Sequence, residues 1–279
     1  MVTSRAIADA VAEAIATAAV ELRPDFLAAL REAAAAEPSE RGRRVLHQLV
    51  ANAEIADRDR VPLCQDTGTV WVRVVLGSDE AVGGDLQAEV DAAVETAFRD
   101  NALRMSVARD ALLDRTNTGT NTPAFIDVLM RPGRGATVDV MLKGGGSDNA
   151  SAIAMLDPSE GLEGVRRVVV AAVEAKASGA CPPLLVGVGV GGTFDKVAGL
   201  AKSALLRRLD EPNPDPRLTE IEATLLEAVN ATGIGPAGLG GATTALGVHV
   251  VTAPCHIAAL PVAVNTGCSA VRAGRVVLE

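Results

Sequence analysis

The sequence predicts a mixed α/β fold, a single domain in which helices and strands are interleaved along all 279 residues. Apolar residues recur at helical spacing in several stretches, and short apolar runs typical of strands lie between those stretches. The segments follow no fixed repeat, which favours one α/β or α+β unit. Hydrophobic residues make up 48% and charged residues 22%, so the chain can bury a full core and is not intrinsically disordered.

Helices are expected over the alanine-rich residues 1–60. Pro24 and Asp25 open one helical stretch, and Pro38 ends it because proline cannot continue a helix. Ser39 follows, and a serine hydroxyl commonly accepts a hydrogen bond from the first backbone N–H groups of a helix. We therefore expect Ser39 to cap the next helix.

The middle of the chain is expected to contain two strands separated by a helix and a long loop. Residues 70–76 predict a strand, residues 85–101 an amphipathic helix, and residues 137–142 a second strand. Residues 103–124 are polar, rich in Asn, Thr and Arg, and lack periodicity. Irregular stretches of this length inside a compact domain are usually functional, so we expect this loop to serve a site.

The C-terminal half is expected to alternate helices with strands. Helices are predicted at 159–178, 193–209 and 218–230, and strands at 184–190, 249–253, 260–265 and 271–279. Residues 212–216, Pro-Asn-Pro-Asp-Pro, predict a surface excursion between two of the helices.

Composition excludes two classes of protein. The formal net charge is −9, and the chain has four Phe, one Trp and no Tyr, whereas nucleic-acid-binding proteins use basic patches and aromatic stacking surfaces. No window is long and apolar enough for a membrane span. The start resembles a signal peptide, but Asp9, Glu13 and Glu21 interrupt its apolar run. A cytoplasmic location is therefore expected.

A glycine motif leaves a second functional class open. Gly187, Gly189 and Gly192 fit the G-x-G-x-x-G pattern, and Asp210 follows about twenty residues later, where a ribose-binding acid would stand. However, the chain then enters residues 212–216 and another helix rather than a second parallel strand. A dinucleotide-binding oxidoreductase is therefore a remote alternative, and the helix N-terminus at this turn is expected to face an anionic ligand.

Three polar clusters are candidates for a functional site, and each has an ordinary structural alternative. Residues 64–68, Cys-Gln-Asp-Thr-Gly, place a thiol, an amide and a carboxylate before a strand, but they also suit a simple polar turn. Residues 143–146, Lys-Gly-Gly-Gly, suit either backbone binding of an anion or a flexible loop. His256, beside Cys255, is either a catalytic or a structural histidine.

Seven motifs follow one another in a recognisable order. They are CQDTG at 64–68, RxNTGxNTPA at 115–124, KGGGSDN at 143–149, GACPP at 179–183, GVGVGGTFDKVAGLAKSALLR at 187–207, GIGPAGLGG at 233–241 and CHIAALPVAVNTGC at 255–268. Together they closely resemble the iron–sulfur-dependent class I fumarate hydratase and L(+)-tartrate dehydratase family. The resemblance covers residues 40–279 and is to the α subunit, or N-terminal domain, of that family.

The resemblance implies a [4Fe–4S] cluster in which one iron has no protein ligand. The four cysteines form no CxxC motif and are too few for the disulfide scaffold of a secreted protein, so on their own they equally suit buried thiols. By motif, the cluster ligands are Cys64, Cys181 and Cys268, and Cys255 is left as a structural residue.

The resemblance also implies the residues that act on the substrate. The catalytic residues are expected to be Asp66 and His256, and the substrate-binding residues Gln65, Arg104, Gly144 and Gly145. A guanidinium such as that of Arg104 suits a carboxylate because it forms two parallel hydrogen bonds.

The expected reaction is the reversible hydration of fumarate to malate, with L(+)-tartrate dehydration as the alternative. Thr120 stands where the family usually has an acidic residue, which weakens an exact substrate assignment. Family members that work as single chains carry a second, C-terminal domain, whereas this sequence ends shortly after Cys268. The chain is therefore expected to be an α subunit that needs a β subunit for activity, most simply in an α2β2 complex. A non-catalytic iron–sulfur scaffold is a further alternative.

Overall fold

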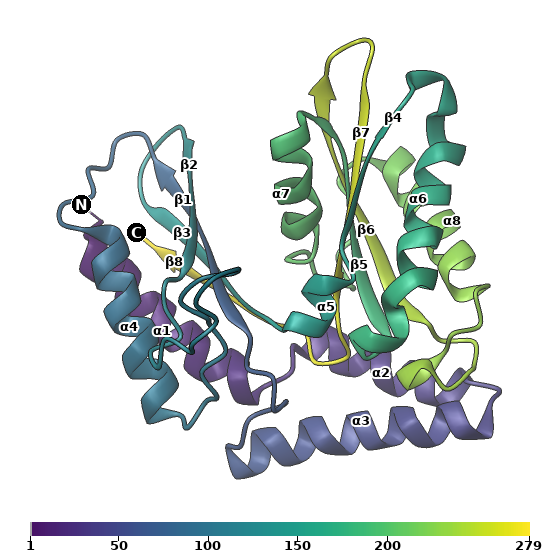
Figure 1. The fold of residues 1–279 in the computed structure, drawn as a ribbon, viewed down its shortest axis with the longest axis horizontal. Coiled ribbons are helices and arrows are strands. Elements are labelled where there is room, and N and C mark those ends of the chain that lie inside the picture. The colour runs from purple at the N-terminus through teal and green to yellow at the C-terminus, as the bar shows by residue number, and fades with distance from the viewer. Residues whose placement is uncertain (1) are drawn as a thin grey trace. The chain divides into compact units, whose positions relative to one another are not determined.

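The computed structural model describes residues 2–279 and confirms the mixed α/β class (Figure 1). The chain divides into two compact units. The first comprises Met1–Arg23, Ala53–Gly145 and Arg272–Glu279, and the second comprises Pro24–Asn52 and Gly146–Val271. Helices α3 (Glu40–Asp59) and α5 (Gly145–Asn149) contain residues of both units.

The first unit is a four-stranded mixed sheet with two helices packed together. In the order of pairing, its strands are β2 (Phe125–Arg131), β1 (Thr69–Gly77), β3 (Ala136–Lys143) and β8 (Arg272–Leu278). Only β1 and β2 are parallel. Helices α1 (Ser4–Val20) and α4 (Leu86–Asp100) pack on each other, and α1 also packs on β3 and β8. The core lies between these helices and alternate strand residues such as Val70, Val72 and Val74.

The helix starts of the first unit have local causes. The Thr3 side chain accepts a hydrogen bond from the Ala6 N–H and caps α1. The Asp85 carboxylate accepts one from the Ala88 N–H, 3.0 Å away, and caps α4, the helix predicted over residues 85–101. Residues 103–124 form no regular element beyond one bridge, between Ala108 and Asn117, which agrees with the predicted loop.

The second unit is a four-stranded mixed sheet with helices on both faces. In the order of pairing, its strands are β4 (Ala152–Leu156), β7 (Leu260–Gly267), β5 (Leu184–Gly192) and β6 (Ala245–Cys255). Its helices are α2 (Pro24–Ala36), α6 (Gly161–Lys176), α7 (Phe194–Ala204) and α8 (Pro216–Asn230), with short 3₁₀ turns at Pro158–Glu160, Ala177–Ala180 and Pro236–Gly238. Helix α7 covers one face, and α6 and α8 cover the other (Figure 1).

The glycine motif serves packing within this sheet. A Cβ at Gly187 would lie 2.2 Å from the Ala201 carbonyl oxygen, and one at Gly189 would lie 2.4 Å from the Val197 carbonyl oxygen. Both carbonyls belong to α7, so the glycines let this helix approach the strand closely. Strand β5 is parallel to β6 but antiparallel to β7, which differs from the all-parallel sheet of a dinucleotide-binding domain.

A buried carboxylate in the second unit, that of Glu37, links the end of α2 to the segment just before β6. Glu37 is 2% exposed and accepts hydrogen bonds from the backbone N–H groups of Ser39, Ala242 and Thr243 and from the Thr243 hydroxyl. Burial alone would raise the pKa of Glu37, but these hydrogen bonds outweigh burial and lower the pKa below its ordinary value. Ser39 caps α3 as predicted, because its hydroxyl accepts the Gly42 N–H at 3.2 Å.

Among residues 2–279, no helix is both long and apolar enough to cross a membrane.

Candidate active site

Strand register in the first unit brings three distant chain segments to one end of its sheet. Thr69 begins β1 and pairs with Lys143, the last residue of β3. Arg272 begins β8 and pairs with Leu142. Because both pairings are antiparallel, the residues before β1, the residues after β3 and the start of β8 lie side by side. The CQDTG and KGGG motifs therefore meet here.

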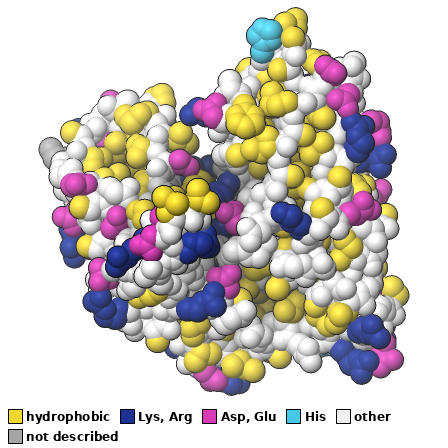
Figure 2. Space-filling view, viewed as in Figure 1, with side chains coloured by type: hydrophobic (Ala, Val, Ile, Leu, Met, Phe, Trp, Pro, Cys, Tyr) yellow, Lys and Arg dark blue, Asp and Glu magenta, His cyan; other side chains and the backbone are white. Residues whose placement is uncertain are grey.

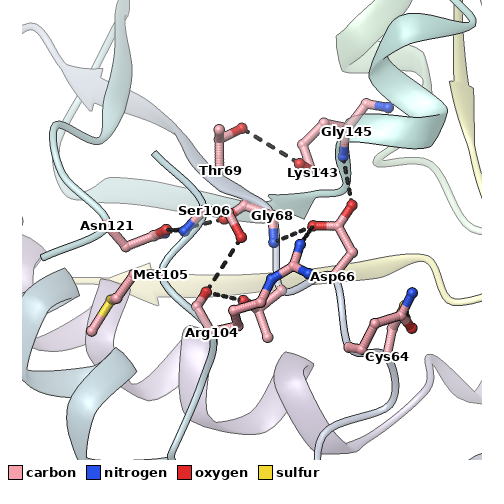
Figure 3. Close-up of polar contacts among 12 residues, drawn as sticks. Cys64, Asp66, Gly68, Thr69, Arg104, Met105, Ser106, Asn121, Lys143 and Gly145 are labelled. Carbon is pink, nitrogen blue, oxygen red and sulfur yellow. Dashed lines mark hydrogen bonds and ion pairs between the residues drawn. The ribbon is translucent and has the colours of Figure 1, made fainter. Parts of the chain in front are cut away.

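Asp66 is held at this meeting point by two backbone N–H groups (Figure 3). Its Oδ1 accepts the Gly68 N–H at 3.1 Å, and its Oδ2 accepts the Gly145 N–H at 2.8 Å. Gly68 has a φ of +78°, and a Cβ there would lie 2.5 Å from the Lys143 carbonyl group, so only glycine fits. The carboxylate is thus fixed in place while its side chain remains 26% exposed.

Arg104 lies beside Asp66 but is only loosely tied to it. One guanidinium nitrogen, Nη2, lies 3.5 Å from Asp66 Oδ1, and the Arg104 side chain is 59% exposed. An exposed pair at this distance contributes little to stability, on the order of 0–1 kcal/mol. The arrangement therefore leaves the guanidinium able to bind an anion next to the carboxylate.

The loop 103–124 positions both side chains through buried hydrogen bonds that the sequence does not reveal. Asn121 is fully buried, and its amide donates to the Gly68 carbonyl at 3.1 Å and accepts the Ser106 N–H at 2.6 Å. The Thr67 hydroxyl donates to the carbonyl of Arg104 itself. Asn121 and Thr67 therefore join the Asp66 loop to the Arg104 segment. Both stand in quoted motifs, which is the only sequence signal for them.

The other predicted substrate-binding residues of the first unit contact residues of the same site. Gln65 Oε1 accepts a hydrogen bond from the Cys64 thiol at 3.3 Å. The Gly145 N–H binds Asp66, so in this structure it holds the acid. Gly144 lies next to both Asp66 and the guanidinium of Arg272. Gln65, Asp66, Arg104, Gly144 and Gly145 thus all belong to the first unit.

Two of the predicted cluster ligands lie together in the second unit. The Ser269 N–H, one residue after Cys268, donates to the Cys181 carbonyl at 3.0 Å. Cys64 belongs to the first unit. None of the four cysteines is in a disulfide, and none of Cys64, Cys181 and Cys268 is fully buried. Within residues 2–279, no three His, Cys, Asp or Glu side chains form a ready-made site for a single metal ion. Accessible thiols are nevertheless the donors that iron–sulfur clusters require, so the set fits.

His256 lies at the opposite end of the second unit's sheet from Cys181 and Cys268. It occupies the exposed turn between β6 and β7, where its Nδ1 accepts the Ala258 N–H at 3.1 Å and where a histidine reaches the surface (Figure 2). The eight residues of β7 separate this turn from Cys268, a span of about 26 Å at a typical strand rise. The structure does not bring His256 together with these two cysteines.

The same hairpin borders an apolar cavity of about 440 Å³. Leu162, Val165, Ile221 and Leu260 line it together with Cys255 and His256. A dianionic ligand would lose its hydration there without gaining a cationic partner, which is costly. The cavity is therefore a poor candidate for an acidic substrate.

Comparison with known proteins identifies the family. The family model described as "Fumarate hydratase (Fumerase)" matches residues 8–277. The chain belongs to the fumarate hydratase family. It is 38% identical over 272 residues to "Putative L(+)-tartrate dehydratase subunit alpha" of Methanocaldococcus jannaschii, with 95% of each chain covered. It is 34% identical over 277 residues to "L(+)-tartrate dehydratase subunit alpha" of Escherichia coli K12, covering 98% of this chain and 91% of the other.

The fumarate hydratase match confirms the resemblance seen in the seven motifs and extends it. The match begins at residue 8 and so includes most of α1, whereas the resemblance inferred from the motifs covers residues 40–279. The matched region includes the whole of the second compact unit and nearly all of the first.

Proposed function

We propose that this chain is the α subunit of a hydro-lyase that acts on a small 2-hydroxydicarboxylate or its unsaturated product. The relatives' names make L(+)-tartrate the first substrate to test, and the family description makes the fumarate and malate pair the second. Both reactions eliminate or add water next to a carboxylate, so one kind of site serves either.

The observation that carries the proposal is the fixed carboxylate of Asp66 beside the guanidinium of Arg104. Elimination of water from a 2-hydroxy acid needs a base for the proton next to a carboxylate and a cation for the charge that develops there. Asp66 is held by two N–H groups and stays accessible, which suits a base or a residue that orients one. Arg104 suits the binding of a substrate carboxylate.

Cys64, Cys181 and Cys268 are proposed to hold the [4Fe–4S] cluster. When bound, a cluster with an open iron supplies a Lewis acid for the departing hydroxyl group. In this chain Gln65 adjoins the thiol of Cys64 and places its amide at the same end of the sheet as Asp66.

A β subunit is the proposed partner, because the similar proteins are named as alpha subunits. We propose an α2β2 assembly, in which the β subunit contributes further groups to the substrate pocket.

Anaerobic co-expression with a candidate β subunit tests the proposal. The purified complex should dehydrate L(+)-tartrate or interconvert fumarate and malate, whereas the α chain alone should have little activity. Assays on fumarate, malate and both tartrate enantiomers distinguish the substrates. A complex that holds the cluster but turns over none of these compounds would contradict the proposed function.

A further inference from the structure

The start of β8 carries a buried guanidinium that the proposed function does not use. Arg272 is 3% exposed, and its buried Nε has no hydrogen-bond partner. Within residues 2–279 the Arg272 side chain forms no ion pair. A buried charge without a counter-charge is costly, so such a group is normally retained for a ligand.

Arg272 and Asp66 flank the same small space at Gly144. The position that a Cβ would take at Gly144 lies 3.5 Å from Arg272 Nη2 and 3.1 Å from Asp66 Oδ2. Asp66 is already held by Gly68, Gly145 and Arg104, and it forms no ion pair with Arg272. A cation and an acid therefore both lie beside Gly144, so close that a side chain at residue 144 would crowd the acid.

We propose that the unpartnered guanidinium of Arg272, beside Gly144 and Asp66, forms a subsite for the 2-hydroxycarboxylate end of the substrate. The carboxylate would bind the Arg272 guanidinium, which supplies the missing counter-charge. The neighbouring hydroxyl or carbon-bound hydrogen would then face Asp66, which accepts but cannot donate when it is ionised. This inference rests on the proposed function for its substrate class, and it adds a second cationic residue to Arg104.

The subsite predicts that Arg272 is needed for binding and not for folding. Replacement of an unpaired buried charge by an apolar side chain leaves no orphaned partner, so Arg272→Met should keep or raise the unfolding temperature of the ligand-free protein. Arg275, on the same strand, is the matched control because its Nε donates to Asp139 Oδ1 at 2.6 Å. Arg275→Met should lower the unfolding temperature and leave anion binding unchanged.

Binding is measured on the full chain with succinate, a four-carbon dicarboxylate that has no hydroxyl group or double bond to react. Succinate should raise the unfolding temperature of the wild-type chain above that seen in sodium chloride of equal ionic strength. Arg272→Met should weaken succinate binding by about 30-fold or more, the usual effect of removing one partner of a buried charge pair. Arg272→Lys should fall in between.

Gly144→Ala tests the position beside Arg272. Gly144 does not have a left-handed φ, so alanine causes no backbone strain there, but its methyl group would lie 3.5 Å from Arg272 Nη2 and would press on Asp66 Oδ2 at 3.1 Å. The variant should fold and retain iron, and it should bind succinate more weakly. In the assembled enzyme, Arg272→Met and Gly144→Ala should raise KM by at least as large a factor as they lower kcat.

Two results would overturn the subsite: unchanged succinate affinity in Arg272→Met, whatever its unfolding temperature, or loss of cluster iron from that variant. The last would assign Arg272 to the cluster. The succinate measurements need neither a β subunit nor turnover. An assembled enzyme that binds succinate through Arg272 but lacks hydro-lyase activity would therefore refute the proposed function alone.

Discussion

The Oδ2 atom of Asp66 accepts a hydrogen bond from the backbone N–H of Gly145 at 2.8 Å, across 79 residues of sequence. The bond joins the loop before β1 to the end of β3, and the Gly68 N–H holds the other oxygen of the same carboxylate. Asp66 is thus fixed by the backbone on both sides, which explains how an exposed acid keeps one orientation beside Arg104.

Asp66→Asn tests whether this fixed carboxylate takes part in catalysis. The variant should keep the cluster and lower kcat by ~10²-fold or more, the usual size of a lost acid–base function. Iron content and rate are measured on the same preparation, and Asp79→Asn, an exposed carboxylate of the same unit, is the control. Wild-type turnover in Asp66→Asn with a full cluster would show that CQDTG is only a ligand loop.

Arg104→Lys tests the second side chain of the pair. An ammonium group cannot form the two parallel hydrogen bonds of a guanidinium, so KM should rise while cluster content stays constant. Stability should change little, because the ion pair with Asp66 is long and exposed. An unchanged KM would remove Arg104 from the substrate-binding residues.

Asn121→Ala should displace the segments that carry Arg104 and Asp66, although Asn121 itself is not expected to contact the substrate. It leaves the Ser106 N–H and the Gly68 carbonyl without their buried partner, which should lower the free energy of unfolding by about 1–3 kcal/mol. Because both partners lie in the segments that carry Arg104 and Asp66, KM should rise as well. Urea denaturation measures the first effect, and Asn117→Ala, on the exposed part of the loop, should cost less.

Single serine substitutions test the cluster ligands. Cys64→Ser, Cys181→Ser and Cys268→Ser should each abolish retention of iron after anaerobic reconstitution, because serine does not replace a thiolate ligand. Cys255→Ser should retain it, since the Cys255 thiol donates to the Ala259 carbonyl in the β6–β7 turn. Retention in the Cys268 variant together with loss in the Cys255 variant would reverse the assignment.

The lowered pKa of Glu37 predicts that the second unit loses part of its stability at low pH. Its pKa is lowered in the folded chain, so its contribution to stability is complete above about pH 4.5 and is lost as pH falls through the folded-state pKa. Glu37→Gln should therefore lower the free energy of unfolding by about 2 kcal/mol at pH 7, where hydrogen bonds to a charged acceptor are lost. The difference from wild type should shrink as pH falls below this range. A constant difference at all pH values would refute the assignment.

Much of the secondary structure is predictable from local sequence. Ser39 caps a helix as expected, residues 85–101 contain the predicted helix, and the runs at 70–76 and 184–190 form strands. A helix cap depends on hydrogen bonds within a few residues, and a run of apolar residues is typical of a buried strand. Neighbouring residues are therefore enough to predict both features. Helix α7 ends at Ala204 rather than at 209, where the chain continues in turns.

Strands β2 and β4 are absent from the sequence prediction. Most residues of β2 (Phe125–Arg131) are exposed, and buried and exposed residues do not alternate along it. The strand lies at the edge of the sheet and pairs only with β1. In β4 no residue is fully buried. Edge strands are defined by their partner rather than by their own pattern.

The sequence by itself determined the family, the helices and the residue types of the site, since motifs and periodicity are properties of neighbouring residues. Only the tertiary structure decided which of those residues meet. The pairing of Thr69 with Lys143 and of Leu142 with Arg272 brings Asp66, Gly144 and Arg272 to one end of the first unit's sheet. The register between strands far apart in the chain depends on which face of each strand is buried in the core. The local patterns CQDTG and KGGG do not predict that register.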